Sequence, residues 1–118
     1  MLQSKTSSLH TYENMKIQAE EMSQAADVAV GLLQSLGHKS RLMILCQLLE
    51  GEKSVGQLAD FLQARESTVS QHLALLRKDR IVTPRRQGQT IFYAIASDPA
   101  RRLLETLYEI YCPRHVIP

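Results

Sequence analysis

The chain has 118 residues, of which 44% are hydrophobic, 22% charged and 5% aromatic, with no tryptophan. This length and composition fit one folded domain with a single core and argue against a disordered chain. The scarcity of aromatic residues argues against a stacking platform for single-stranded nucleic acid. No apolar run approaches the roughly 18 residues that span a bilayer, and the polar N-terminal stretch lacks the hydrophobic segment of a signal peptide. We therefore expect a cytoplasmic protein without a membrane partner.

The net charge is only +2, but the positive charge is concentrated in one segment. Residues 65–86 carry six basic and two acidic side chains, a net of +4, whereas the rest of the chain carries a net of −2. A localised basic stripe is the electrostatic footprint of a phosphate-binding surface. A solvated charged face would give the same count, so charge alone leaves both interpretations open.

Helical periodicity dominates the N-terminal half of the chain. Residues 1–10 show no period and are expected to form a flexible N-terminus, with residues 11–118 making one domain. Apolar residues recur at helical spacing from Tyr12 to Leu36, which predicts a first helix of about 20–25 residues. Ser40 is expected to cap a second helix that runs to about Glu50. Ser54 is expected to cap a short third helix whose inward residues are Val55, Leu58, Ala59 and Leu62.

A polar turn at residues 63–66 leads to a fourth helix, in which Val69, Leu73 and Leu76 lie at i, i+4 and i+7 and are expected to face inward. Its other side carries short polar side chains, which let a helix backbone approach the floor of a DNA major groove. Two helices joined by a tight turn in this way indicate a helix-turn-helix. The residues expected to contact DNA from this helix are Ser67, Thr68, Ser70, Gln71, His72 and Arg77. For His72, packing against the turn is an equally good interpretation.

The periodicity then changes to that of β-strands. Residues 81–86 and 89–96 are rich in β-branched and aromatic residues and are separated by Gln87-Gly88, which predicts a hairpin. Pro84 marks an edge strand, because it cannot donate to a ladder. Arg85 and Arg86 are expected to reach a flanking phosphate or the minor groove. The fold expected is a winged helix-turn-helix, mainly α with a small β-hairpin, in the order α-α-α-α-β-β-α; a five-helix domain with a charged surface hairpin is the alternative.

The last helix is expected to begin with Asp98 as its N-cap, followed by Pro99, and to end at Pro113. Its broad apolar side consists of Ala100, Leu103, Leu104, Leu107, Ile110 and Tyr111. A single winged helix contacts little DNA, and two helices with long apolar faces need a partner. A homodimer meets both needs, because two recognition helices then read half-sites about one helical turn apart.

The run STVSQHLALLR at residues 67–77, followed by IVTPRR at 81–86 and IFY at 91–93, strongly resembles the ArsR/SmtB family of bacterial winged-helix repressors. The resemblance covers about 100 residues. It implies a homodimer, built from the first and last helices, that binds an imperfect palindrome in double-stranded DNA. Two positions depart from the family pattern: Arg65 stands where relatives often place a capping Ser, and Gln89 stands where a wing Arg is common. These departures concern the details of the DNA contact rather than its mode.

Members of this family release DNA when a ligand binds, commonly a metal. A thiolate metal site in the third helix would require cysteines where Ser54 and Gly56 stand, and the last helix contains no His. The remaining candidates are Cys46, Cys112 and His115, fewer than the four ligands that zinc prefers. We therefore expect neither a metal nor a cofactor, with a metal- or metalloid-responsive repressor as an alternative.

The two cysteines are Cys46 in the second helix and Cys112 at the end of the last, 66 positions apart. From the residues alone, two buried structural thiols are as good an interpretation as a reactive pair. The runs RLMILC at 41–46 and LETLYEIYC at 104–112 are similar to the BigR/SqrR branch, whose members sense persulfides through one Cys in each helix. The resemblance implies a repressor of sulfide-detoxification genes that is released when reactive sulfur species link Cys46 to Cys112. The HlyU-like proteins have the same cysteine pair and act instead as antirepressors.

The sequence carries no sign of catalytic machinery. It contains no C-x-x-C pair, and no Ser/His/Asp set, paired-carboxylate site or Gly-rich phosphate loop is apparent. We therefore expect a DNA-binding protein rather than an enzyme.

Overall fold

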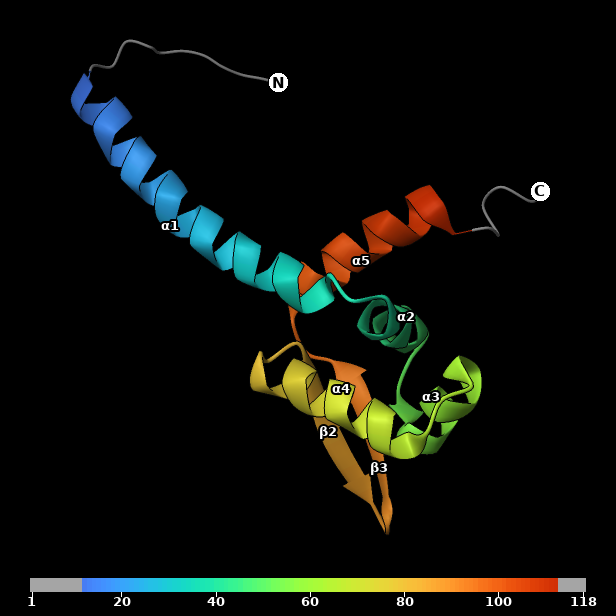
Figure 1. Ribbon diagram of the computed structural model, residues 1–118. Coiled ribbons are helices and arrows are strands. Elements are labelled where there is room, and N and C mark those ends of the chain that lie inside the picture. Colours follow the sequence, from blue (N-terminus) through green and yellow to red (C-terminus); the bar gives the residue numbers. More distant parts are fainter. Residues whose placement is uncertain (1–11, 113–118) are drawn as a thin grey trace. The chain divides into compact units, whose positions relative to one another are not determined.

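A computed structural model of the chain describes residues 12–112, with side chains from Met15 onward (Figure 1). The chain divides into two units between Leu33 and Gln34. The described elements, in chain order, are α1 (Tyr12–Leu36), α2 (Lys39–Leu48), β1 (Lys53–Ser54), α3 (Val55–Leu62), α4 (Glu66–Lys78), β2 (Val82–Gln87), β3 (Thr90–Ile95) and α5 (Asp98–Tyr111). The expected flexible segment 1–10 and the expected helix end at Pro113 lie outside the described residues.

The second unit is a winged helix-turn-helix, as the sequence predicted. Helices α2, α3 and α4 pack on one another, and the β2–β3 hairpin projects beside α4 (Figure 1). Helix α5 follows the hairpin and packs against α2. The largest fully buried side chains come from α2, α3, α4 and α5: Ile44, Leu45, Leu48, Leu58, Val69, Leu73, Leu76 and Leu104. None of the described helices has the length and apolar character needed to cross a bilayer.

The helix caps agree with the sequence at one position and differ at two. Ser54 caps α3 as expected, and it forms a capping box with Gln57. The cap of α2 is His38, not Ser40: the His38 Nδ1 accepts a hydrogen bond from the Ser40 backbone at 3.2 Å. The cap of α5 is Ser97, not Asp98, because the Ser97 hydroxyl accepts from the Ala100 backbone at 3.2 Å.

The expected two-stranded hairpin belongs to a three-stranded antiparallel sheet in the order β1-β3-β2. The additional strand, β1, is only two residues long and pairs with Phe92 and Tyr93 of β3. Strand β2 lies at the sheet edge, in agreement with its Pro84. Gln87 pairs with Thr90, so the turn consists of Gly88 and Gln89 rather than of Gln87-Gly88. Gly88 has a φ of 63°, a left-handed conformation that costs glycine little.

Polar contacts tie the last residues of α1 to the end of α4. The buried Ser35 hydroxyl donates to the Asp79 carboxylate at 2.6 Å, and Asp79 is the C-cap of α4. Arg41 donates through Nε to the Ser35 carbonyl at 2.8 Å and through Nη2 to the Gln34 carbonyl at 3.3 Å. The two Arg41 bonds satisfy carbonyls of the kind that a helix end leaves without partners.

Candidate nucleic-acid interface and thiol pair

Helix α4 separates apolar and polar side chains onto opposite faces. Val69, Leu73 and Leu76 are 0% exposed, as their spacing predicted. Five of the six residues expected to contact DNA from this helix are exposed: Ser67, Thr68, Ser70, Gln71 and Arg77. The helix therefore presents its hydroxyl, amide and guanidinium groups to solvent while its other face is fixed in the core.

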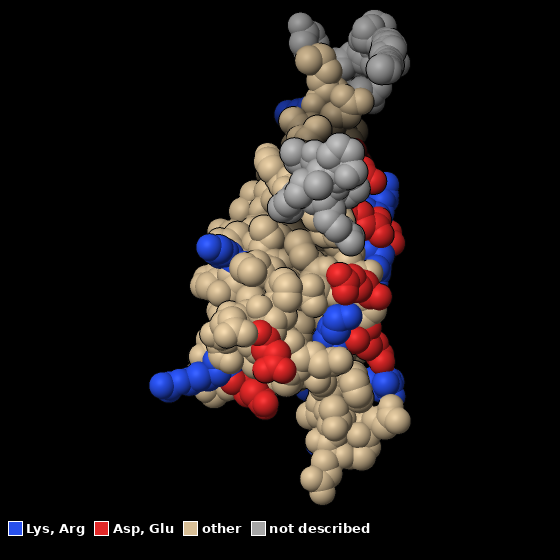
Figure 2. Space-filling model, turned by 90° about the vertical axis from the view of Figure 1, so that its right-hand side faces the viewer, with Lys and Arg blue, Asp and Glu red and all other residues tan. Residues whose placement is uncertain are grey.

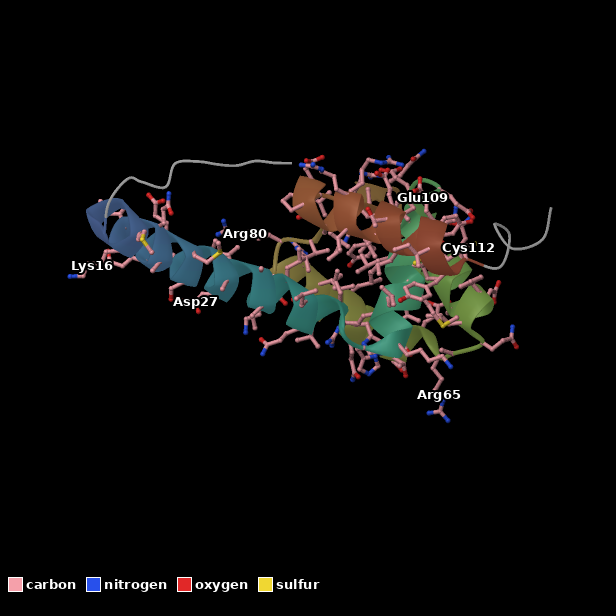
Figure 3. All side chains as sticks on the ribbon, turned by 90° about the horizontal axis from the view of Figure 1, so that it is seen from above. Lys16, Asp27, Arg65, Arg80, Glu109 and Cys112 are labelled. Carbon is pink, nitrogen blue, oxygen red and sulfur yellow. The ribbon has the colours of Figure 1, made fainter. Side chains whose placement is uncertain are left out.

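The start of α4 shows the consequence of the arginine at position 65. Gln63 adopts a left-handed conformation in the turn, with a φ of 55°. Arg65 is the N-cap and makes no side-chain capping hydrogen bond. Its side chain extends away from the helices into solvent (Figure 3). A serine at this position would be occupied with capping, whereas Arg65 presents a cation at the edge of the exposed face.

His72 lies on the inner side of α4. Its Nδ1 is buried and has no hydrogen-bond partner among the described residues. Its ring lies 4.8 Å from the His38 ring, measured between centroids. Burial lowers the pKa of His72, and the charges of His38 and Arg41 lower it further. The buried Nδ1 and the contact with the His38 ring fit the packing interpretation, and the phosphate contact of His72 stays a prediction.

The two hairpin arginines differ in their partners. Arg86 is exposed and makes no side-chain hydrogen bond or ion pair within the part of the chain that the structure describes. Arg85 pairs with Glu52, with Nη2 at 2.8 Å from Oε1. The hydrogen bond from Arg85 lowers the pKa of Glu52, and Glu52 raises the pKa of Arg85. Glu52 was not predicted from the sequence, because a lone carboxylate 33 positions before its partner carries no recognisable signal.

An open hollow of about 410 Å³ lies between α3, α4 and the hairpin. It is lined by Ser54, Val55, Gly56, Glu66, Ser70, Gln89, Thr90 and Ile91. Ser70 is one of the expected DNA contacts, and Gln89 is the wing position that departs from the family pattern. The hollow shows that the hairpin and α4 flank a shared concave surface.

The two cysteines lie on helices that pack together. Cys46 is in α2, and Cys112 is the C-cap of α5, where its backbone N–H donates to the Tyr108 carbonyl at 2.8 Å. Figure 3 shows Cys112 at the end of α5, where this helix passes over α2. Both side chains are half-buried thiols.

The Cys46 thiol interacts electrostatically with Cys112. Burial is the larger cause that raises the pKa of Cys46, and the charge of a Cys112 thiolate raises it further. Such an interaction requires two groups that are close in space. The two thiols therefore lie on packed helices and within electrostatic range of each other, although they are 66 positions apart in the sequence.

The sequence of this chain matches a known protein family and its members. The family described as "Bacterial regulatory protein, arsR family" matches residues 38–83, from the α2 cap into β2. The biofilm growth-associated repressor of Agrobacterium fabrum is 48% identical over 89 residues, which cover 75% of each chain. The chain belongs to the ArsR family.

Two solved structures of ArsR-family relatives have the same fold. Reduced HlyU from Vibrio cholerae superimposes with a TM-score of 0.77 at 42% identity, covering 79% of this chain and 98% of HlyU. The repressor BigR from Xylella fastidiosa superimposes with a TM-score of 0.74 at 40% identity, covering 81% of this chain and 95% of BigR. These relatives are transcription regulators, so this ArsR-family chain is a DNA-binding regulator and not an enzyme.

The described residues of this ArsR-family chain contain no cluster of side chains that could bind a metal ion. Within residues 15–112, no three His, Cys, Asp or Glu side chains form a group that could hold a metal ion. The hydroxyl of Ser54, at one of the positions considered for a thiolate, caps α3. His115 lies outside the described residues.

Proposed function

We propose that this ArsR-family regulator is a homodimer that binds a palindromic operator and releases it when sulfur atoms bridge Cys46 and Cys112. The observation that carries the proposal is the packing of α5 against α2, which places the two thiols within electrostatic range of each other. The resemblance to the persulfide-sensing branch names the same two positions. One structure of V. cholerae HlyU is described as that of the reduced protein, so its redox state is specified.

The DNA contacts are assigned to the exposed face of α4 and to the hairpin. Ser67, Thr68, Ser70 and Gln71 are short side chains that can read base edges or bind phosphate in the major groove. Arg77 supplies a cation at the end of the helix. The concave surface between α4 and the hairpin suits the flank of a duplex whose major groove receives α4.

The second copy is assigned to the apolar faces that this chain leaves in solvent. On α1, the side chains of Met15, Met22 and Leu33 are 59%, 69% and 54% exposed. On α5, Ile110 and Tyr111 are 59% and 74% exposed. Faces of this kind on two helices are characteristic of a protein interface. Operator half-sites one helical turn apart then match two copies of α4.

The sensing chemistry balances with a persulfide donor, RSSH. One cysteine thiolate attacks the outer sulfur of the donor, which forms a protein persulfide and releases RS⁻. The second cysteine thiolate attacks the inner sulfur of that persulfide, forms a disulfide and expels HS⁻. If both cysteines are first persulfidated, attack of one on the inner sulfur of the other gives a trisulfide and again expels HS⁻. Each added sulfur relaxes the limit of about 7 Å that a plain disulfide sets on the Cα separation.

The raised pKa of Cys46 fits a selective sensor. At neutral pH a thiol with a raised pKa is mostly protonated, and the thiolate is the nucleophile. Cys46 therefore attacks diffusing oxidants slowly, whereas a persulfide on Cys112 would be held next to it. The attack rate of Cys46 is expected to keep rising with pH beyond the ordinary thiol pKa of about 8.5.

Linking the cysteines would restrain α5 against α2. Because α5 is assigned to the dimer interface, such a restraint changes the relative placement of the two copies of α4. The bridge alters DNA affinity only as far as the two redox states differ in free energy of binding, typically by about 1–3 kcal/mol.

An activating or antirepressing role is the second candidate. V. cholerae HlyU is described as a transcriptional activator, and it is 42% identical over 93 residues. The same operator binding and the same thiol switch would then have the opposite transcriptional output. A transcription assay on the upstream region, with and without the protein, separates the two roles.

The test is DNA binding by the wild type, Cys46→Ser and Cys112→Ser, before and after treatment with glutathione persulfide. All three reduced proteins are expected to bind the chain's own upstream region equally. Treatment is expected to weaken wild-type binding by about 5- to 150-fold and to leave both variants bound. Release of either single variant by persulfide would contradict the dithiol mechanism. Failure of the reduced wild type to distinguish its own region from scrambled DNA would contradict operator binding.

A further inference from the structure

Arg85 pairs with Phe92 in the hairpin and is held by three neighbouring side chains. Its Nε and Nη2 donate to the two carboxylate oxygens of Glu52, with Nε at 2.9 Å from Oε2 and Nη2 at 2.8 Å from Oε1. Its Nη1 donates to the Gln87 side-chain oxygen at 3.0 Å. The guanidinium carbon lies 5.1 Å from the centre of the Phe92 ring, within range of a cation–π interaction. Every nitrogen of the guanidinium is thus engaged within the subunit.

The sheet register places Arg85 and Arg86 on opposite faces. Arg85 pairs with Phe92, and Arg86 pairs with Ile91. Because side chains alternate along a strand, Arg86 shares its face with the buried Val82. Ile91 lines the hollow together with residues of α4. Arg86 therefore lies on the face of the sheet that carries the buried Val82, and Arg85 lies on the opposite face.

We propose that Glu52 is a specificity-determining residue that withholds Arg85 from the DNA backbone, so that Arg86 is the phosphate contact of the wing. This inference rests on the proposed operator binding. Arg binds phosphate best through the same bidentate fork that Glu52 now occupies. The pair is also close to electrically neutral, which removes one charge per subunit from the attraction that acts on any DNA sequence.

A purely stabilising role does not account for this pair. The side chains of Arg85 and Glu52 are 50% and 38% exposed, and ion pairs at such exposure contribute little to folding. Figure 2 shows acidic and basic side chains mixed along one edge of the face that it draws, so charge pairing occurs elsewhere on this surface too. The pair of Glu52 with Arg85 differs from these other pairs because Glu52 accepts hydrogen bonds from an arginine of the hairpin.

The experiment measures the salt dependence of binding, which a structural role would not change. Dissociation constants for the upstream duplex and for a scrambled duplex are compared between 50 and 200 mM salt. The variants are Glu52→Gln, Arg86→Gln and the double variant Glu52→Gln/Arg85→Gln. Asp60→Asn is the matched control, because it removes a negative charge from exposed α3 surface and releases no guanidinium. Thermal unfolding establishes that each variant is folded.

Each phosphate contact contributes a slope of about 0.9 in log affinity against log salt, or about 3.5-fold over this fourfold range. Glu52→Gln is expected to steepen the slope by about 0.9 per subunit and to tighten binding to the scrambled duplex more than the control does. Arg86→Gln is expected to reduce the slope by the same amount. The double variant is expected to keep the wild-type slope.

Two results would overturn the inference. One is a double variant that loses as much slope as Arg86→Gln, since Arg85 would then leave Glu52 to bind phosphate. The other is a Glu52→Gln slope equal to that of Asp60→Asn. Wild-type protein that shows no salt-dependent binding to either duplex would instead overturn operator binding itself.

Discussion

Helices α1 and α4 have similar helical patterns of apolar residues but bury them to opposite extents. On α4, Leu73 and Leu76 are 0% exposed. On α1, Met15 and Met22 are 59% and 69% exposed. The period of a sequence thus predicts that a helix forms and which face is apolar, but not which surface covers that face. The face of α4 is covered within the subunit, whereas that of α1 is available to a second copy.

The largest expected effect comes from truncating a side chain on the buried face of α4. Leu73→Ala is expected to lower the free energy of unfolding by about 2–5 kcal/mol, through lost apolar contacts and the cavity left behind. Leu75→Ala on the same helix is the control, because Leu75 is 49% exposed and should cost far less. Urea unfolding measures both. Equal losses for the two variants would show that α4 is not anchored as described.

The second prediction tests the face of α1. Met22→Lys is expected to weaken self-association by at least about 1 kcal/mol, which is about fivefold in dimer affinity, because it places a charge in an apolar interface. Gln24→Lys adds the same charge about 200° around the helix and is the control. Sedimentation equilibrium measures both. A dimer unaffected by Met22→Lys, or affected equally by Gln24→Lys, would argue against this face as the interface.

The smallest expected effect is the acid sensitivity of the inner side of α4. Burial, His38 and Arg41 lower the pKa of His72, so at mildly acid pH the unfolded chain binds a proton that the folded chain resists. The contribution of His72 to stability is therefore complete above the ordinary pKa of about 6.5 and is lost as the pH falls through the lowered folded value. Urea unfolding at pH 7 and pH 5 should show a smaller acid loss for His72→Gln than for wild type. If His72→Gln and wild type lost the same stability between pH 7 and pH 5, the pH dependence would come from other groups.

The elements that the sequence predicted correctly depend on local patterns. The i, i+4, i+7 spacing of α4, the capping serine at position 54 and the edge-strand Pro84 each act within a few residues. The shifted caps at His38 and Ser97 are local too, but several polar side chains compete for the same N–H groups. Only the fold decides which of them reaches the right geometry.

The features that the sequence did not reveal depend on contacts between distant residues. Strand β1 has two residues and exists because β3 passes beside it. The pairing of Glu52 with Arg85 joins positions 33 apart, and the Ser35–Asp79 bond joins positions 44 apart. For the thiols, the residues alone left structural and reactive interpretations open. That the two thiols lie on packed helices became visible only in the fold.

Mass spectrometry of the persulfide-treated, DNA-released protein would detect the sulfur bridge itself. We expect a pair of peptides, one containing Cys46 and the other Cys112, joined within one subunit by two or more sulfur atoms. We also expect this bridge and DNA release to appear at the same rate and to be reversed together by a thiol reductant. Release of DNA with sulfur added to one cysteine alone, and no bridged peptides, would contradict the dithiol mechanism.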